Sequence, residues 1–214
     1  MRLYIVRHGE TDWNKARRVQ GHSDIPLNEY GIHLAEQTAE GMKDIHFDLA
    51  YTSPLIRAKQ TAEIILAGRD IPVLESEGIK ELGFGAYEGV CCSGENRAKE
   101  SEAIKSFFTD TGNYVPAEGG ESIQALMERT GNFLRKLCGD ASLQGKQILV
   151  STHGAAMTAL LNQIRGNLDI ADFWKCQGPP NCAVTIVEVK DGVPSIMEEN
   201  VIYYKEPVRA WSVE

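Results

Sequence analysis

Short apolar segments of strand length alternate along this chain with longer segments whose apolar residues recur at helical spacing. Strands are expected at 3–6, 47–51, 71–74, 147–150, 183–189 and 196–201. Helices are expected at 29–42, 55–67, 95–108, 122–137 and 155–164. This alternation predicts an α/β fold, a three-layer sandwich with a mostly parallel central sheet and helices on both of its faces. Asp191 and Gly192 should turn the last two strands into an antiparallel edge hairpin.

The segment from about 78 to 120 does not fit this alternation, because it is rich in glycine and charge and contains no clear strand. We interpret it as a cap insertion that covers a site, although a plain surface excursion fits the pattern equally well. With 214 residues, 43% of them hydrophobic, the chain can bury one substantial core. We therefore expect a single domain over residues 1–214 that includes this insertion.

Three of the expected strands lead into residues that share a chemistry. The first strand leads into Arg7 and His8, and the second leads into Arg57 in the first turn of a helix. The fourth strand leads into His153. Each of these two histidines is followed by a glycine, which lets the backbone turn sharply and approach a ligand closely. Because ligands of open α/β sheets bind at the carboxyl ends of the strands, we expect these side chains to meet at one site.

Two arginines and two histidines at one edge of a sheet suit a tetrahedral anion such as a phosphoryl group. Helix N-termini at the same edge would add backbone N–H donors. His8 can act as a nucleophile when one ring nitrogen is unprotonated, and the neighbouring cations should lower its pKa. The net charge of the chain is −8, so this site would be a positive island in an acidic protein. The remaining histidines are interpreted as structural or surface residues: His22, His33 and His46.

Composition argues against several other classes of protein. The basic residues are scattered, so nucleic acid is not expected as a partner. No apolar run approaches the ~20 residues of a membrane span, and no signal peptide is expected before the first strand. The five cysteines have irregular spacing and no Cys-x-x-Cys pair, which predicts reduced thiols in a cytoplasmic protein. The adjacent Cys91 and Cys92 would be reactive only if they were exposed.

Five motifs occur in order over most of residues 2–190. They are RHGET at 7–11 with Asn14, QG at 20–21 followed by DIPLN at 24–28 and Gly31, SPLIRAKQTA at 53–62, ELGFGAYEG at 81–89, and STHG at 151–154. Together they resemble the histidine phosphatase superfamily, which includes cofactor-dependent phosphoglycerate mutases and many phosphomonoesterases. The resemblance implies an enzyme that forms a covalent phosphohistidine without a metal, and the phosphomonoesterases of the superfamily would need no cofactor.

The resemblance also implies a role for each residue of the site. His8 would be the nucleophile, and Glu81 would donate a proton to the leaving oxygen and then activate water. His153 would complete the catalytic set by binding the transferred phosphoryl group. The other residues that would bind the phosphoryl group are Arg7, Asn14, Gln20, Gly21 and Arg57. From the residues alone, Glu10 and Glu88 are equal candidates for the acid, and only the resemblance ranks Glu81 first.

The segment at 81–89 and the GGES sequence at 119–122 resemble the phosphatase branch, and the chain is short for a glycolytic mutase. We therefore expect a metal-independent hydrolase of a small-molecule phosphomonoester. The alternatives are a 2,3-bisphosphoglycerate-dependent phosphoglycerate mutase and a non-catalytic sensor of a phosphate ligand. A zinc site built from two histidines and a glutamate is disfavoured, because the arginines would repel a cation. Aromatic residues of the cap could pack on an apolar leaving group or simply fill the core: Phe84, Tyr87, Phe107, Phe108 and Tyr114.

Overall fold

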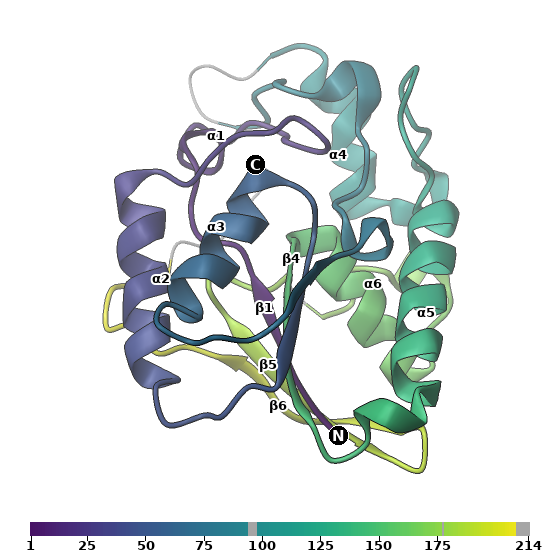
Figure 1. Cartoon of the computed structure of the whole chain (residues 1–214). Helices are drawn as coiled ribbons and strands as arrows, with labels where there is room; N and C mark the ends of the chain where they lie inside the picture. Colours follow the sequence, from purple (N-terminus) through teal and green to yellow (C-terminus); the bar gives the residue numbers. More distant parts are fainter. Residues whose placement is uncertain (94–97, 177, 209–214) are drawn as a thin grey trace.

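The computed structural model describes residues 1–93, 98–176 and 178–208. Within them, the centre of the molecule is a six-stranded sheet in the order β3-β2-β4-β1-β5-β6 (Figure 1). The strands are β1 (Arg2–Arg7), β2 (Leu49–Thr52), β3 (Val73–Glu75), β4 (Gln147–Thr152), β5 (Val184–Lys190) and β6 (Val193–Val201). The first four are parallel to one another, whereas β5 runs antiparallel to both of its neighbours, β1 and β6. The predicted α/β fold with a mostly parallel sheet is confirmed.

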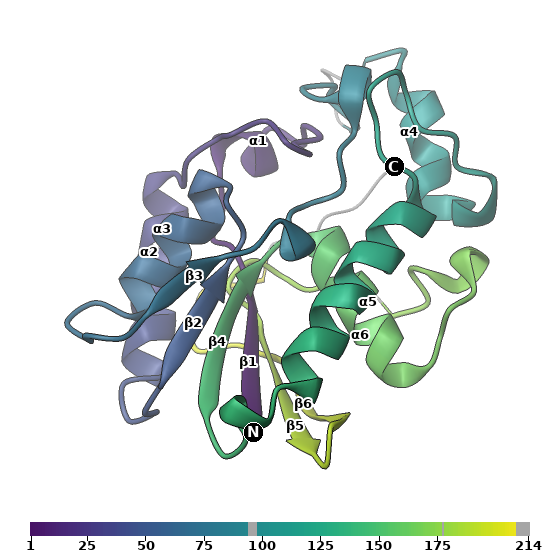
Figure 2. The same ribbon diagram turned by 45° about the vertical axis from the view of Figure 1, so that its right-hand side comes forward.

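Helices cover both faces of this sheet (Figure 2). The helices α2 (Glu29–Gly41) and α3 (Ile56–Ile65) lie on one face, and α5 (Ile123–Gly139) and α6 (Gly154–Arg165) lie on the other. Side chains alternate between the faces of a strand, so Leu3 and Ile5 of β1 pack with α5 and α6. Tyr4 and Val6 pack in the other core, which includes residues of α3.

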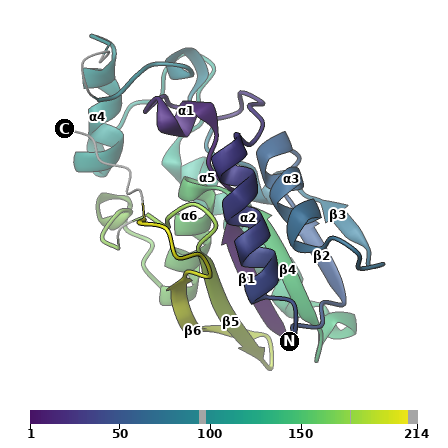
Figure 3. The same ribbon diagram turned by 90° about the vertical axis from the view of Figure 1, so that its left-hand side faces the viewer.

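The antiparallel pair β5–β6 lies at the edge opposite β3 (Figure 3). Its two-residue turn has positive φ at both positions, 52° at Asp191 and 78° at Gly192, as a tight hairpin requires. The predicted hairpin is therefore confirmed. The strand β6 begins at Val193, earlier than the expected residue 196. Pro194 lies within it opposite Val189, and a proline is tolerated there because β6 is an edge strand.

The segment between β3 and α5 lies over the carboxyl ends of the parallel strands (Figure 1). Its described residues include the helix α4 (Ser101–Thr109) and three short 3₁₀ turns. The expected helix at 95–108 was placed too early: residues 98–100 form no helix, and 94–97 lie outside the described residues. The buried face of α4 starts at Ser101 and continues at Ile104 and Phe107, and Lys99 and Glu100 just before it are exposed.

This segment packs on the rest of the domain through an apolar cluster of its own. Leu82, Phe84 and Phe107 of the segment contact residues of α5 and α6 there, among them Leu126 and Ala156. The segment is thus anchored to two helices of the sheet's face, directly beside the strand ends that carry Arg7 and His153.

Candidate active site

Strand register brings the two histidines together. Arg7 at the end of β1 pairs with Thr152 at the end of β4, and the N–H of His8 donates to the Thr152 carbonyl at 2.9 Å. The next residues along both strands are therefore neighbours. The ring centroids of His8 and His153 lie 5.1 Å apart, and the two residues are 2% and 0% exposed. The meeting of the two predicted histidines at one edge of the sheet is confirmed.

The backbone fixes the tautomer of His8. Its Nδ1 lies 2.6 Å from the carbonyl oxygen of Gly9, which can only accept a hydrogen bond, so Nδ1 carries the proton. The lone pair is then on Nε2. The pKa of His8 is lowered well below its usual value, first by burial and then by the charges of Arg57 and Arg7. The predicted direction is correct, although burial contributes more than the cations do.

The glycine after His8 is required by a close approach of two backbones rather than by a ligand. A Cβ at Gly9 would lie 2.5 Å from the carbonyl oxygen of Gly31 in the first turn of α2. The N–H of Gly9 donates to Thr61 in α3 at 3.0 Å. The glycine after His153 does face the site, since a Cβ at Gly154 would lie 3.8 Å from Glu81 Oε2.

Both predicted arginines are held rigidly by backbone carbonyls. Arg57, in the first turn of α3, donates to the carbonyls of Gly21 at 2.7 Å and Ser23 at 2.8 Å. Arg7 donates to the carbonyl of Pro179 at 2.6 Å. Burial lowers the pKa of Arg57 to about 10, so this side chain remains cationic at neutral pH. The buried Nε atoms of both arginines have no hydrogen-bond partner among the residues that the structure describes.

His153 is oriented by a serine. Its Nε2 lies 2.7 Å from Ser53 Oγ, which accepts the N–H of Leu55 at 3.3 Å. Ser53 Oγ can donate to Nε2 while it accepts from Leu55, and in that arrangement the ring proton of neutral His153 is on Nδ1. Within the described part of the chain, this Nδ1 is buried without a partner. Burial, followed by the charge of Arg57, lowers the pKa of His153 well below its usual value.

Glu81 joins the beginning of α6 to the site. One carboxylate oxygen, Oε1, accepts the N–H groups of Leu82 at 2.9 Å and Ala156 at 3.1 Å. The other, Oε2, accepts the N–H of Ala155 at 3.2 Å. These donors hold the carboxylate at the N-terminus of α6, where backbone N–H groups have no intrahelical partner.

The two rival carboxylates lie elsewhere. Glu88 accepts the N–H of His22 at 2.8 Å, the hydroxyl of Ser23 at 2.6 Å and the N–H of Phe84 at 3.2 Å. Glu10 accepts the side-chain amide of Asn28 at 3.1 Å. Glu81 lines the cavity described next, and neither rival is among the residues lining it.

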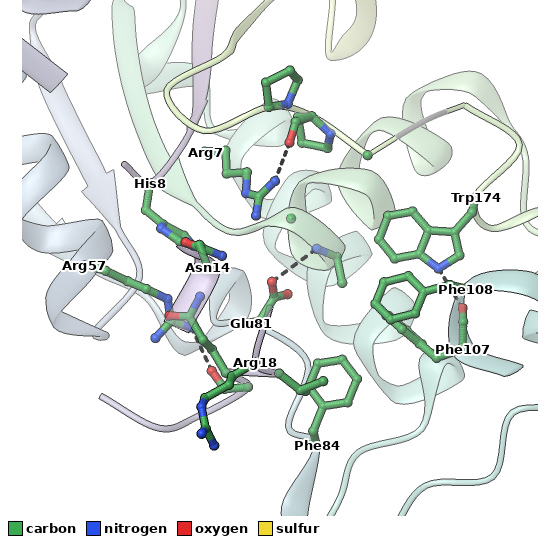
Figure 4. A pocket seen from close by; sticks show the side chains of 18 of the residues that line it. Arg7, His8, Asn14, Arg18, Arg57, Glu81, Phe84, Phe107, Phe108 and Trp174 are labelled. Carbon is green, nitrogen blue, oxygen red and sulfur yellow. Dashed lines mark hydrogen bonds between the residues drawn. The ribbon is translucent and has the colours of Figure 1, made fainter. Parts of the chain in front are cut away.

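A cavity of about 640 Å³ opens beside these groups (Figure 4). The predicted site residues that line it are Arg7, His8, Asn14, Gln20, Gly21, Arg57 and Glu81. His153 lies against the His8 ring and is not among the described lining residues. Three predicted aromatic residues, Phe84, Phe107 and Phe108, also line the cavity, whereas Tyr87 and Tyr114 pack behind them in the apolar cluster.

Asn14, Gln20 and Gly21, the other residues predicted to bind phosphate, also make contacts that stabilise the fold. Asn14 Oδ1 accepts the N–H and hydroxyl of Thr11 in a capping box of α1 (Asp12–Lys15), so the Asn14 side-chain amide donors take no part in that box. Gln20 Oε1 lies 3.0 Å from the same Thr11 hydroxyl, whose one hydrogen is shared between Asn14 and Gln20. Gly21, at a φ of 52°, presents its carbonyl to Arg57, and a Cβ there would clash with the carboxylate of Glu88.

Several residues of the site were not predicted from the sequence, among them Arg18, Ser53 and Trp174. Arg18 lines the cavity and donates to the carbonyl of Gly89 at 2.7 Å. Ser53 orients His153, and Trp174 lines the cavity from the segment after α6. Ser53 comes two residues after the strand expected at 47–51, which was a usable signal. Arg18 and Trp174 lie in irregular segments, where no periodicity indicates direction.

Other predictions of composition can be compared with the structure. The structure shows all five cysteines as free thiols, four of them buried, and the adjacent Cys91 and Cys92 are in the buried group. Across 1–93, 98–176 and 178–208, no cluster of three or more His, Cys, Asp or Glu side chains is placed to hold a metal ion. None of the helices described is both long enough and apolar enough to cross a bilayer.

The buried, neutral histidines predict a loss of stability in mild acid. Folding lowers the pKa of His8 and His153, so the unfolded chain binds more protons once the pH falls below about 6.5. Stability present above that pH should fall by up to about 1.4 kcal/mol per pH unit for each histidine. Urea unfolding at pH 7.5 and 5.5 measures the loss, which His8→Asn should reduce. An unchanged wild-type stability would contradict the neutral assignment.

The sequence model of the histidine phosphatase superfamily (branch 1) matches residues 3–202 of the chain. The chain belongs to this superfamily. "Uncharacterized phosphatase PhoE" of Bacillus subtilis (strain 168) is 40% identical over 162 residues, which cover 76% of each chain. The chain is thus an enzyme of the phosphatase class within this superfamily.

Solved structures have the same fold. The structure of Bacillus stearothermophilus YhfR superposes with a TM-score of 0.85 at 30% identity, covering 94% of this chain and 98% of that chain. A mutant phosphoserine phosphatase from Entamoeba histolytica, solved in complex with phosphoserine, has a TM-score of 0.77 at 29% identity. That match covers 93% of this chain and 96% of the other. The latter neighbour binds a small phosphorylated compound.

Proposed function

We propose that this protein hydrolyses small-molecule phosphomonoesters through a phosphohistidine on His8, without a metal ion. The observation that carries the proposal is the convergence of a neutral His8 with buried, unpaired nitrogens. Arg7 Nε, Arg57 Nε and His153 Nδ1 are buried polar atoms without a hydrogen-bond partner in the described residues. Buried polar groups ordinarily find partners, and with the ring proton of His153 assigned to Nδ1, the three nitrogens are N–H donors that match the oxygens of a phosphoryl group.

In the first step, Nε2 of His8 attacks the phosphorus. The P–N bond forms as the bond to the leaving oxygen breaks, and protonated Glu81 gives that oxygen its proton. Glu81 Oε2 accepts one backbone N–H, from Ala155, which leaves a lone pair at which the transferred proton can sit. Arg7 and Arg57 offset the negative charge of the phosphoryl group during transfer.

In the second step, the Glu81 carboxylate takes a proton from water as the water oxygen attacks phosphorus. The P–N bond breaks, inorganic phosphate forms, and His8 and Glu81 return to their starting protonation states. We assign His153 Nδ1–H, together with the side-chain amides of Asn14 and Gln20, to bind phosphoryl oxygens in both steps. Gly21 contributes through the carbonyl that holds Arg57.

Two features favour hydrolysis over the mutase alternative. A mutase has to exclude water from its phosphohistidine and bind small, strongly anionic phosphoglycerates. The cavity here holds about 640 Å³, and away from Arg7 and Arg57 its lining is mainly apolar or aromatic, with Arg18 as one further cation. A sensor has no use for a nucleophile and an acid beside one anion site.

Metal independence follows from the same charges. Arg7 and Arg57 supply the electrostatic stabilisation that a divalent cation gives in other phosphoryl-transfer sites, and they would repel such an ion. The scattered basic residues still argue against a nucleic-acid partner. A cytoplasmic location and a single domain with residues 78–120 as its cap remain predictions of the sequence.

Steady-state phosphate release from a panel of phosphomonoesters, in excess EDTA, tests this proposal. We expect turnover that EDTA does not change, because the chain itself supplies the nucleophile, the acid and the anion site. The same protein is then given 3-phosphoglycerate with 2,3-bisphosphoglycerate. Isomerisation faster than hydrolysis would make it a mutase, phosphate binding without turnover would make it a sensor, and loss of turnover in EDTA would refute metal independence.

A further inference from the structure

The segment that carries Glu81 has no regular structure to hold it. Residues 80–84 lie between two 3₁₀ turns and belong to no strand or helix. The Glu81 carboxylate is hydrogen-bonded at the beginning of α6, but those bonds hold the end of the side chain and not the backbone from which it extends. The groups that fix this backbone therefore determine where the carboxyl group of Glu81 meets a leaving oxygen.

An arginine of α5 holds this backbone directly. Arg129 Nη1 donates to the Lys80 carbonyl at 2.6 Å, and its Nη2 donates to the Glu81 carbonyl at 2.8 Å. Longer bonds join Nη1 to the carbonyls of Gly78 at 3.3 Å and Glu77 at 3.4 Å. Four backbone carbonyls of one short segment thus converge on a single guanidinium group.

Glu121 binds the other side of the same guanidinium group. Its Oε1 accepts the Nε–H of Arg129 at 2.7 Å and its Oε2 accepts from Nη2 at 2.8 Å, in the forked pairing of an arginine with a carboxylate. Glu121 also holds Gly83, because its N–H donates to the Gly83 carbonyl at 2.7 Å and its Oε2 accepts the Gly83 N–H at 3.3 Å. The Arg129 and Glu121 side chains are 23% and 18% exposed, so water competes little for these bonds. This pair, the clamp, therefore binds the chain on both sides of the Glu81 side chain.

Other contacts keep the segment on the domain. Leu82 is fully buried in the apolar cluster that includes residues of α5 and α6. The hydroxyl of Thr152 donates to the Ile79 carbonyl at 2.7 Å. The Glu81 carbonyl also accepts a hydrogen bond from Nε2 of the exposed His22 at 2.9 Å. Loss of the clamp should therefore displace the acid rather than unfold the protein.

The charge of Arg129 is a second way in which this residue could act. Burial lowers the pKa of His153 most, the charges of Arg57, His8 and Arg7 lower it further, and the charge of Arg129 adds to them. Lysine carries the same charge but has no planar fork of donors, so it cannot bridge a carboxylate and two carbonyls in this way. Geometry and charge can therefore be separated by one substitution.

We propose that Arg129, fixed by Glu121, is a positioning residue for the general acid: it holds the backbone of Glu81 so that the carboxyl group reaches the leaving oxygen. The proposal rests on the proposed function for the role of Glu81 as the acid. Neither Arg129 nor Glu121 is among the described residues that line the cavity, so both act through Glu81 and not on the substrate. The effect should be confined to esters whose leaving oxygen has to be protonated.

Ethyl phosphate and 4-nitrophenyl phosphate are the probes, because only the ethyl ester has a leaving oxygen that needs a proton. We measure kcat/KM, which reports the step that forms phosphohistidine. Arg129→Ala should lower kcat/KM for ethyl phosphate by about 10–10²-fold and that for 4-nitrophenyl phosphate by about threefold at most. In a Glu81→Gln background the same substitution should cost less than about twofold on ethyl phosphate, because no acid is left to misplace.

Two conservative variants test the fork itself, and a third variant is the control. Arg129→Lys should lose most of the same ratio of kcat/KM between the two esters, whereas Glu121→Gln keeps one acceptor oxygen and should lose less. Arg165→Ala is the matched control, because the Arg165 side chain is also 23% exposed and is paired with Glu199, at the end of α6 far from Glu81. It should lower stability and leave the ratio unchanged.

Binding of methylphosphonate, which has no leaving oxygen and cannot be hydrolysed, should be the same in Arg129→Ala, Arg129→Lys and the wild type when measured by calorimetry. An equal fall in kcat/KM for both esters, or a wild-type ratio in Arg129→Lys, would overturn positioning by the fork. Should Arg129→Ala fail to fold, Arg129→Lys and Glu121→Gln decide by the same ratio.

Glu81→Gln alone separates this proposal from the proposed function. A changed ratio in Glu81→Gln with an unchanged ratio in the Arg129 variants would leave the phosphatase mechanism intact and overturn the positioning role. An unchanged ratio in Glu81→Gln would show that the proposed function names the wrong acid, and the positioning role would fall with it.

Discussion

Replacement of His8 by alanine should lower kcat for ester hydrolysis by at least about 10⁴-fold, because it removes the atom that forms the covalent bond to phosphorus. The effect is expected to be this large since Nε2 of His8 has a defined lone pair, set by the bond from Nδ1 to Gly9. Arg7, Arg57 and His153 would remain, so the variant should still bind phosphate. Stopped assays of released phosphate, run with protein free of contaminating phosphatases, measure the loss.

His46→Ala is the matched control, because His46 is exposed and does not line the cavity. It should retain wild-type turnover. A His8→Ala protein that folds, binds methylphosphonate and keeps more than a few per cent of wild-type kcat would contradict the nucleophilic role. Circular dichroism at the assay temperature distinguishes lost chemistry from lost structure.

Glu81→Gln should lower kcat by about 10²–10⁴-fold for esters with poor leaving groups, because glutamine cannot donate a carboxylic-acid proton. Its side chain has the same shape and can still accept an N–H at the beginning of α6. The loss should be much smaller for 4-nitrophenyl phosphate, whose leaving group needs little protonation. A plot of log kcat against leaving-group pKa should therefore become steeper in the variant.

Glu88→Gln serves as the control for this result. Glu88 is hydrogen-bonded to the backbone of His22 and Phe84 and to the hydroxyl of Ser23, and it does not line the cavity. Its replacement should reduce stability without changing the dependence on the leaving group. If Glu81→Gln slowed all esters by one common factor, or if Glu88→Gln steepened the plot, the acid would have to be reassigned.

The parts of the fold that could be predicted from the sequence are those marked by a clear local pattern. Apolar runs located all six strands to within a few residues, and Asp191-Gly192 located the hairpin. The order of the strands could not be predicted, because it depends on which helix covers which face. The start of α4 was misplaced because charged residues before Ser101 have good helix propensity but no apolar face to bury.

The site residues that could be predicted are those at the ends of strands, because the sheet fixes their positions. His8, Arg7 and His153 follow strands directly, so the parallel register alone brings them together. Glu81 follows a 3₁₀ turn in an irregular segment, and its place at the N-terminus of α6 depends on long-range packing that no local pattern encodes. The resemblance to the superfamily was therefore needed for it. Trp174 neither follows a strand nor belongs to one of the motifs that resemble the superfamily.

Trapping the phosphorylated enzyme tests most directly whether His8 is the nucleophile. Wild-type protein is mixed with a ³²P-labelled phosphomonoester in EDTA, denatured in base within milliseconds, and digested with trypsin. We expect label that is stable in base, is lost in acid, and lies in the peptide of residues 8–15, whose single histidine is His8. Label in the peptide of residues 147–165, which contains His153, or turnover with no labelled protein at any quench time, would contradict it.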